Sequence, residues 1–365
     1  MMKKRLKLLF IQRDLKSGGA QRAMVYIAQL LAKEEFDCFI YSYNASLPEI
    51  PISSEIHYIP EKNPHGESVI SKYVYPIFQV RKVVRKITPD CIIAFTPSPC
   101  VAAIFGRFFS CCKIPVIVCE RSDPYFENNL RFRILRYFFR FADYGVFQTK
   151  QSQNYFKKLR KKSSVIANPA KPVKFLANKF EERDRTISLV ARLDITQKRQ
   201  DVMLKAMVEL KQKYPDYKLL LYGEGADENH LKEMAKSLGV SDVVVFKGNV
   251  ENVVSEVVKS QFSVLTSDFE GIPNVLIESM SMGLTVISTD TSPGGARFLI
   301  SDGVNGRIVS RGDFKSIASL ISYYIEHPQE ANILGENAKK VIEDLSPDKI
   351  KDQWISVINK VTNNG

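Results

Sequence analysis

The sequence predicts an α/β protein of two domains, each built on a doubly wound parallel sheet with helices on both faces. Three observations lead to this prediction. At 365 residues the chain is long enough for two domains that each bury a core. Short apolar runs alternate with amphipathic helical stretches along almost the whole chain, as in parallel strands joined by helices. A proline-bearing, charged stretch at 168–184 interrupts the alternation, as an interdomain connection does.

The first domain is predicted over residues 1–170. Its first apolar run breaks at Ser17-Gly18-Gly19 and gives way to a helical pattern at 20–32, where apolar residues recur at three- and four-residue spacing. Strands are expected at 5–12, 38–43, 91–95, 116–118 and 144–147. Most of these runs end in a polar or proline-bearing loop, so functional loops are expected at the carboxyl ends of the strands.

The second domain is predicted over residues 171–345. Strands are expected at 186–191, 217–222, 243–246, 262–265, 285–288 and 306–309, and helices at 199–213, 227–238, 251–260, 273–282 and 313–326. A last helix within 346–365 carries Trp354, the single tryptophan, and is expected to pack back on the first domain.

Composition indicates a globular protein that stays inside the cell. The chain is 45% hydrophobic and 25% charged, and its apolar runs are shorter than the roughly 18–20 residues that a membrane span needs. Its first residues are too promptly charged for a signal peptide. The six cysteines include no Cys-x-x-Cys pair and no neighbouring histidine cluster, which favours reduced core thiols over disulfides or a metal site.

The positive charge is concentrated in the first half of the chain. Of the formal net charge of +12, residues 1–180 hold 30 Lys and Arg against 13 Asp and Glu, a net +17, which leaves 22 against 27, a net −5, for the rest. The first half is therefore expected to meet an anionic partner. Charge alone does not choose among anionic lipids, lipid diphosphates and nucleic acids.

Two carboxylates lie eight positions apart in the segment from Glu270 to Glu278, the first in a glycine-bearing loop after a strand and the second in the helix that follows. Backbone N–H groups at such a helix start suit phosphate or sugar oxygens, and a carboxylate suits the vicinal hydroxyls of a sugar. Alone, the pair is weak evidence for a site.

Two cations, Arg192 and Lys198, follow a strand six residues apart. Such cations can clamp a diphosphate and stabilise the charge that develops on it when it departs as a leaving group. Glycine loops at 17–19, 222–225 and 293–296 permit close backbone approach to a ligand, although for each loop taken alone a tight turn between strand and helix is the favoured interpretation.

Taken together, these motifs resemble the retaining glycosyltransferases of family 4, which have the GT-B fold, over nearly the whole chain. The resemblance rests on segments 17–22, 191–193 with Lys198, 221–225, 270–278, and 283–290 leading to 302–306. It implies two Rossmann-like domains facing each other across a cleft. It is strongest to members that build capsules, exopolysaccharides and lipid-linked oligosaccharides.

The resemblance also implies roles for single residues. Arg192 and Lys198 would bind the donor diphosphate, and Glu270 would bind the transferred sugar. Glu278 would hold the ribose hydroxyls. Further donor contacts are implied for Gly18, Gly19, Gly223, Gly248, Asn249, Val250, Gly271, Ile272, Asn274 and Val275. Pro273 offers no N–H in this loop.

The implied reaction transfers a hexose or N-acetylhexosamine, with retention, from a nucleotide diphosphate sugar to a lipid-linked or polysaccharide acceptor in bacterial surface glycan biosynthesis. UDP is the expected carrier, and no metal or other cofactor is expected. The departing phosphate itself would contribute to deprotonation of the acceptor hydroxyl.

One loop departs from the family pattern. Many relatives have a histidine near the reacting sugar where this chain has Cys119 to Pro124, so Arg121 and Asp123 are the candidates there. The four histidines, at 57, 65, 230 and 327, lie outside every motif, and no histidine base is expected.

Residues 130–141 predict an amphipathic helix with Leu130, Ile134, Tyr137, Phe138 and Phe141 on one side and Arg133, Arg136 and Arg140 on another. Such a helix can lie in a lipid interface, and basic clusters at 81–86 and 157–162 favour anionic lipid. An ordinary core-packed helix with solvated arginines explains the pattern equally well. We expect a cytoplasmic protein that binds the inner face of the cell membrane peripherally.

Three alternatives are compatible with the sequence alone. An inactive glycosyltransferase-like scaffold subunit would bind nucleotide sugar without turning it over, although the presence of both Glu270 and Glu278 argues against it. A nucleotide-sugar epimerase would release a free nucleotide sugar. A nucleic-acid-binding protein would use the basic half, but no helix-turn-helix, zinc-finger or aromatic RNA-binding signature is present, so no nucleic-acid partner is expected.

Overall fold

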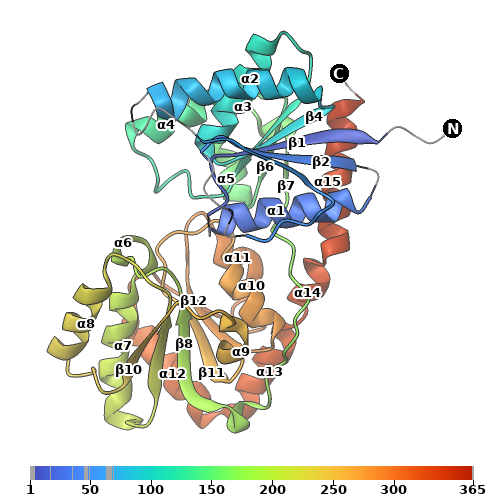
Figure 1. The fold of residues 1–365 in the computed structure, drawn as a ribbon. Coiled ribbons are helices and arrows are strands. Elements are labelled where there is room, and N and C mark those ends of the chain that lie inside the picture. The colour runs from blue at the N-terminus through green and yellow to red at the C-terminus, as the bar shows by residue number, and fades with distance from the viewer. Residues whose placement is uncertain are drawn as a thin grey trace. The chain divides into compact units, whose positions relative to one another are not determined.

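The computed structural model describes residues 5–16, 18–34, 36–44, 48, 50–62, 68 and 70–363. Ser17 of the first glycine motif and His65 lie outside them. The chain divides into unit 1, Met1–Pro169 with Pro347–Gly365, and unit 2, Ala170–Ser346 (Figure 1). Each unit contains a sheet of parallel strands with helices on both faces, which confirms the predicted α/β class.

The sheet of unit 1 has the strand order β3-β2-β1-β4-β5-β6-β7. The strands are β1 (Leu6–Gln12), β2 (Phe36–Ser42), β3 (His57–Pro60), β4 (Cys91–Phe95), β5 (Val116–Glu120), β6 (Tyr144–Phe147) and β7 (Ser163–Val165). The helices are α1 (Gly19–Ala32), α2 (Tyr75–Ile87), α3 (Pro97–Ser110), α4 (Leu130–Tyr137), α5 (Lys150–Tyr155) and α15 (Pro347–Thr362), with a π-helical turn at Ile70–Val74 and 3-10 turns at Phe138–Phe141 and Arg160–Lys162.

Successive side chains of each strand point to opposite faces of this sheet. In β1, Leu9 and Ile11 belong to the apolar cluster that also contains Val80 of α2 and Ala103 of α3. α15 packs against α1 and β4, and its buried Trp354 stacks on Phe95 with 6.2 Å between ring centroids. The C-terminal helix therefore belongs to the core of unit 1.

The sheet of unit 2 has the strand order β10-β9-β8-β11-β12-β13. The strands are β8 (Asp184–Val190), β9 (Lys218–Tyr222), β10 (Val244–Gly248), β11 (Ser260–Leu265), β12 (Thr285–Thr289) and β13 (Arg307–Val309). The helices are α6 (Ile195–Lys198), α7 (Gln200–Lys213), α8 (Glu228–Ser237), α9 (Val253–Val257), α10 (Asn274–Ser281), α11 (Gly295–Leu299), α12 (Phe314–Glu326), α13 (Pro328–Ala338) and α14 (Val341–Asp344), with a 3-10 turn at Phe180–Glu182.

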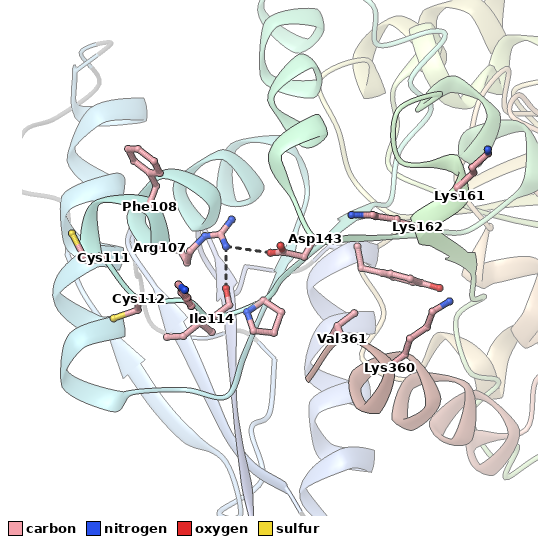
Figure 2. A pocket seen from close by; sticks show the side chains of 13 residues that line it. Arg107, Phe108, Cys111, Cys112, Ile114, Asp143, Lys161, Lys162, Lys360 and Val361 are labelled. Carbon is pink, nitrogen blue, oxygen red and sulfur yellow. Dashed lines mark hydrogen bonds and ion pairs between the residues drawn. The ribbon is translucent and has the colours of Figure 1, made fainter. Parts of the chain in front are cut away.

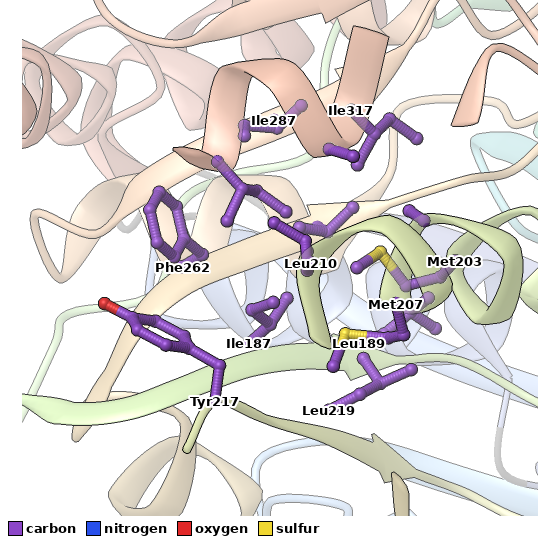
Figure 3. Close-up of a cluster of buried hydrophobic side chains, with 14 of the residues drawn as sticks. Ile187, Leu189, Met203, Met207, Leu210, Tyr217, Leu219, Phe262, Ile287 and Ile317 are labelled. Atoms are coloured by element: carbon purple, nitrogen blue, oxygen red, sulfur yellow. The ribbon is translucent and has the colours of Figure 1, made fainter. Parts of the chain in front are cut away.

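The main core of unit 2 lies between the sheet and helices α7, α8 and α12. Figure 3 shows Ile187 and Leu189 of β8 beside Met203, Met207 and Leu210 of α7 in this core. A smaller apolar cluster contains Tyr222, Val257, Met282 and Leu284. Because both faces are covered, the polar side chains of the unit's site lie in the loops at the strand ends and on the helices that begin there.

Most expected elements are present, with shifted ends. The predicted end of the helix at 251–260 is wrong. Helix α9 ends at Val257, and Ser260 already pairs with Asp184 in the sheet. The edge strands β3 and β7 were not predicted, nor were α13 and α14. Within the described residues, no helix combines the length and apolar character that crossing a bilayer requires.

Candidate functional site

The candidate site of unit 2 lies where its strand order reverses. β8 pairs with β9 on one side and with β11 on the other, so connections leave this point in opposite directions. In open α/β sheets such a point forms a crevice at the carboxyl ends of the strands. The loop after β8 carries Arg192 and Lys198, and the loop after β11 carries Glu270.

The structure brings Lys198 and Glu270 together across 72 residues of sequence. The Lys198 ammonium donates to Glu270 Oε1, and Ser267 Oγ donates to the same oxygen at 2.8 Å. The two side chains are only 18% and 13% exposed, so the pair is largely withdrawn from solvent. A cation and a carboxylate held together at the carboxyl ends of the strands suit a ligand that carries both phosphates and hydroxyls.

Three further hydrogen bonds join the two loops. Gln197 Nε2 donates to the Phe269 carbonyl at 3.1 Å, and the Asp268 amide donates to the Gln197 carbonyl at 2.9 Å. Thr266 Oγ1 donates to the Lys198 carbonyl at 2.7 Å. These bonds fix the backbone on both sides of the ion pair, so the Lys198 and Glu270 side chains are held next to each other.

Arg199, next to Lys198, is a second tie between the loops. Its backbone is left-handed, with φ of 51°, and its guanidinium contacts Asp201 at 2.9 Å and Asp268 at 2.9 Å. The hydrogen bonds that Arg199 donates to Asp201 and Asp268 raise the pKa of its guanidinium despite partial burial. Arg199 therefore positions the site, and Lys198 remains the cation next to Glu270.

Arg192 extends from the end of β8 toward solvent. Its guanidinium donates to Asp194 at 2.8 Å and to Gln197 at 3.3 Å. Asp194 also caps α6 by accepting from the Thr196 amide. Burial alone raises the pKa of Asp194, but hydrogen bonds from Thr196 and the charge of Arg192 outweigh it and lower the pKa. Arg192 thus lies before the short helix α6, and Lys198 is the last residue of that helix.

The glycine loop after β9 packs directly on the loop after β8. Gly223 has φ of 119°, and a Cβ there would lie 2.3 Å from the Ala191 carbonyl oxygen. The Gly223 amide donates to the Gly248 carbonyl at 2.8 Å, which links this loop to the end of β10. Asn249 is exposed, whereas Val250 packs on the smaller apolar cluster of unit 2.

The segment after Glu270 is shaped by the loop after β12. The Glu270 amide donates to the Ser292 carbonyl at 2.8 Å, and a Cβ on Gly295 would lie 1.7 Å from the Gly271 carbonyl oxygen. Of the other residues expected to contact the donor, Ile272 is buried, and Asn274, Val275 and Glu278 are half-buried on α10. Glu278 lies about one turn after the start of that helix.

In unit 1, the glycine motif lies at the corresponding strand end. Gly18 caps α1 in an extended conformation, and Gly19 is the first residue of that helix. Gln12 at the end of β1 is buried and accepts from Thr96 Oγ1, after β4, at 3.4 Å. The proposed contact of Gly18 and Gly19 with the donor stays a prediction.

The two candidates in the loop after β5 are both buried. Arg121 donates to Asn168 Oδ1 at 3.2 Å, and its guanidinium lies 4.6 Å from the centre of the Phe95 ring. Burial lowers the pKa of Arg121. Asp123 accepts from the Tyr125 amide at 2.8 Å, while its Oδ2 is buried without a hydrogen-bond partner among the described residues. Of the two residues, Asp123 is the better placed to accept a hydrogen bond from a ligand, through its Oδ2.

The prediction for 130–141 is wrong for Arg136. α4 ends at Tyr137, and the Arg136 side chain is buried, where it donates to Glu120 at 2.6 Å and to Ser122 at 3.1 Å. In contrast to Arg136, four residues of the predicted apolar side are exposed: Leu130, Ile134, Tyr137 and Phe141. The arginine points inward because Glu120, at the end of β5, needs a cation.

Sequence reasoning missed the residues that support the ion pair: Gln197, Arg199, Thr266, Ser267, Asp268 and Ser292. The polar run Thr266-Ser267-Asp268 directly after a buried strand was the available signal. Among the described residues, no group of three His, Cys, Asp or Glu side chains is placed to hold a metal ion.

Two family models match consecutive parts of the chain. The model described as "Glycosyltransferase Family 4" matches residues 17–172, and the one described as "Glycosyl transferases group 1" matches residues 171–341. Together they extend over both units. Each glycosyltransferase motif of the sequence lies within one of these matches.

The chain is also similar over its full length to a curated protein. A Campylobacter jejuni protein named GalNAc-alpha-(1->4)-GalNAc-alpha-(1->3)-diNAcBac-PP-undecaprenol alpha-1,4-N-acetyl-D-galactosaminyltransferase is 28% identical over 369 residues, which cover 98% of this chain and 99% of that protein.

Two solved structures share the fold. The sucrose-phosphate synthase of Thermosynechococcus elongatus has a TM-score of 0.82 at 16% identity, covering 99% of this chain and 100% of that one. Anabaena Alr3699/HepE in complex with UDP-glucose has a TM-score of 0.78 at 19% identity, covering 97% and 100%. At these identities the likeness concerns the fold alone.

Proposed function

Because the chain belongs to glycosyltransferase family 4 and has the GT-B fold, we propose that it transfers a hexose or N-acetylhexosamine from a UDP-sugar to a lipid-linked or polysaccharide acceptor, with retention of configuration. The observation that carries this proposal is the Lys198–Glu270 pair at the point where the strand order of unit 2 reverses. The chain acts as a glycosyltransferase in bacterial glycan biosynthesis, and the proposal adds the donor, the acceptor and the stereochemistry.

The proposed chemistry depends on charge that develops during transfer. As the bond between the sugar and the diphosphate breaks, negative charge grows on the leaving oxygen. Cations that are already in place stabilise this state more than the bound substrate. Lys198 is held by its pair with Glu270, and Arg192 by Asp194, so neither needs a large rearrangement.

Glu270 and Glu278 take the hydroxyl-bearing parts of the donor in this scheme. The Glu270 carboxylate keeps one oxygen occupied by Lys198 and Ser267 and can accept from a sugar hydroxyl with the other. Glu278, on the first turns of α10, binds the ribose hydroxyls. We assign acceptor deprotonation to the departing phosphate and propose a reaction that needs no metal or other cofactor.

The choice of UDP and of a lipid-linked acceptor is supported by relatives. Anabaena HepE, which has the same fold, was solved in complex with UDP-glucose. The Campylobacter jejuni relative acts, by its name, on a diphosphate-linked undecaprenol glycan. We propose the same classes of donor and acceptor for this chain.

With an acceptor of this kind, we propose that the enzyme works at the inner face of the cell membrane. We propose that unit 1 binds that anionic surface peripherally, because the excess of Lys and Arg falls in residues 1–180 and the apolar side of α4 is exposed. Co-sedimentation with phosphatidylglycerol vesicles that weakens with added salt is the expected result, and sedimentation independent of both salt and anionic lipid contradicts it.

A panel of donors tests the reaction itself. UDP-, GDP- and ADP-linked hexoses and N-acetylhexosamines are incubated with the enzyme, and release of nucleotide is measured with and without a lipid-diphosphate acceptor. We expect a UDP-sugar to be turned over and the product glycoside to keep the donor's anomeric configuration by NMR. Inversion, or release of an epimerised free nucleotide sugar, contradicts the proposal.

Single substitutions test the residue assignments. Lys198→Ala and Glu270→Gln are each expected to lower kcat by about 10²–10³-fold with the confirmed donor, because each removes a preorganised transition-state contact. Lys205→Ala is the matched control, since Lys205 lies on α7 and contacts Asp201 at 3.8 Å, away from Glu270. Unchanged turnover in Lys198→Ala or Glu270→Gln shows that the assignment is wrong.

A further inference from the structure

A cavity of about 700 Å³ opens at the amino-terminal edge of the unit 1 sheet. Its lining includes residues that directly precede three strands: Pro115 before β5, Asp143 before β6 and Lys162 before β7. The strands are parallel, so this edge is opposite the carboxyl ends where Gly18 and Gly19 lie. The cavity is therefore separate from the proposed donor site.

The lining of the cavity is strongly cationic. It contains Arg107, Lys113, Lys161, Lys162 and Lys360 against the single carboxylate of Asp143. Figure 2 shows the Arg107 guanidinium and the Asp143 carboxylate between the cysteines on one side and Lys162 and Lys360 on the other.

The one carboxylate is already engaged. Asp143 accepts from the Val116 amide at 2.8 Å and lies 3.4 Å from Arg107. Lys161 and Lys162 form no ion pair within the described part of the chain, and neither does Lys113. Three lysines of the lining therefore have no carboxylate partner among the described residues, which favours an anionic ligand.

An exposed aromatic strip begins at the rim of this cavity. Phe108 lines the cavity and is 69% exposed. Its ring meets Phe109 edge-on, with 5.5 Å between centroids, and Phe109 stacks on Phe78 of α2 at 6.2 Å. All three are exposed, which costs free energy in water and is typical of side chains that enter a lipid interface.

We propose that this cavity binds the phosphate of an anionic phospholipid head group while Phe108 and Phe109 enter the lipid beside it. The inference rests on the proposed membrane association and gives it a specific site. Cations next to exposed aromatic rings match both parts of such a lipid. A free phosphate shares the charge but would leave the aromatic strip uncovered.

Two cysteines on the cavity wall provide a reporter of occupancy. Cys111 is exposed and Cys112 half-buried, whereas the other four cysteines are buried. In a Cys112→Ser background, alkylation of Cys111 by a neutral maleimide is followed by mass spectrometry. Short-chain phosphatidylglycerol is expected to slow the reaction by about tenfold at roughly ten times its Kd, since only the unoccupied protein reacts.

The ligands compared with it are short-chain phosphatidylcholine, glycerol phosphate and inorganic phosphate. Phosphatidylcholine is expected to give no protection, and the two free phosphates are expected to give much less than the anionic lipid. Equal protection by inorganic phosphate overturns the lipid assignment, because it identifies a free-anion site. Absence of protection by any ligand shows that the cavity is not a binding site.

The charge variant Lys161→Gln/Lys162→Gln tests the lining directly. It is expected to lose protection by phosphatidylglycerol and to sediment less with phosphatidylglycerol vesicles than the control Lys236→Gln/Lys315→Gln, which removes the same charge from exposed positions in unit 2. Equal losses in both variants overturn the proposal, because they indicate a non-specific charge effect. Donor hydrolysis is measured alongside and is expected to be unchanged, so failure of this site is distinguishable from failure of the proposed reaction.

Discussion

At Gly295 a single missing methyl group decides where the loop after Glu270 lies. A Cβ at this position would lie 1.7 Å from the Gly271 carbonyl oxygen and 3.1 Å from Pro273 Cδ. Neither neighbour is the flexible end of a long side chain, so the backbone of the loop itself would have to move. The position of Glu270 therefore depends on a residue 25 positions later in the sequence.

We expect Gly295→Ala to lower donor affinity by at least tenfold and to destabilise the protein by about 1–3 kcal/mol, the usual cost of overpacking. Gly312→Ala is the control: nothing lies within 4 Å of its Cβ, but its φ of 77° imposes a backbone cost of about 1 kcal/mol. Urea denaturation and donor titration separate the two effects. If both variants bind donor equally, the loop does not depend on Gly295.

At the scale of elements, α4 is fixed to the sheet by a buried ion pair. Arg136 and Glu120 are 1% and 0% exposed in their side chains, and Arg136 also contacts Glu127 at 3.3 Å. The Glu120 carboxylate additionally accepts from Ser122 Oγ at 2.9 Å. Because the apolar side of α4 is largely exposed, this polar network supplies much of the helix's attachment.

Removing the arginine should therefore cost far more than removing its neighbours. We expect Arg136→Ala to lower the free energy of unfolding by about 3–5 kcal/mol, since it leaves Glu120 buried without its cation. Arg133→Ala, on an exposed position of the same helix, should stay within about 0.5 kcal/mol. Urea denaturation of both variants checks the difference, and comparable losses would show that burial of the pair is not what anchors α4.

The same helix shows where sequence reasoning reaches its limit. Apolar spacing predicts a helix over 130–141, and the structure has an α-helix at Leu130–Tyr137 followed by a 3-10 turn at Phe138–Phe141, because the period is a local property. Which side of it faces the sheet depends on Glu120, whose position relative to the helix no local pattern encodes. Lys198 and Glu270 could be chosen as site residues from the sequence, since each follows a buried strand. The supporting contacts of Gln197 and Gly295 could not be predicted in this way, because they depend on how three loops pack together.

For the molecule as a whole, burial of ionisable groups makes stability depend on alkaline pH. Burial raises the pKa of Cys38 and Cys119 to about 12, and it raises the pKa of Tyr217 and Tyr222 to about 12 as well. In the unfolded chain these groups ionise near their ordinary values, about 8.5 for cysteine and about 10 for tyrosine. The unfolded state therefore releases protons at a lower pH than the folded state.

The sign of the effect is set by this difference. Below about pH 7.5 both states hold these protons and the full stability is present. Between about pH 8 and 12 the unfolded state binds fewer protons than the folded state, so stability falls with rising pH. Each group contributes a slope of up to about 1.4 kcal/mol per pH unit. Urea denaturation at a series of pH values should show this fall, with a shallower slope in Cys38→Ala/Cys119→Ala. A fall equally steep in the Cys38→Ala/Cys119→Ala protein would locate the titrating groups elsewhere.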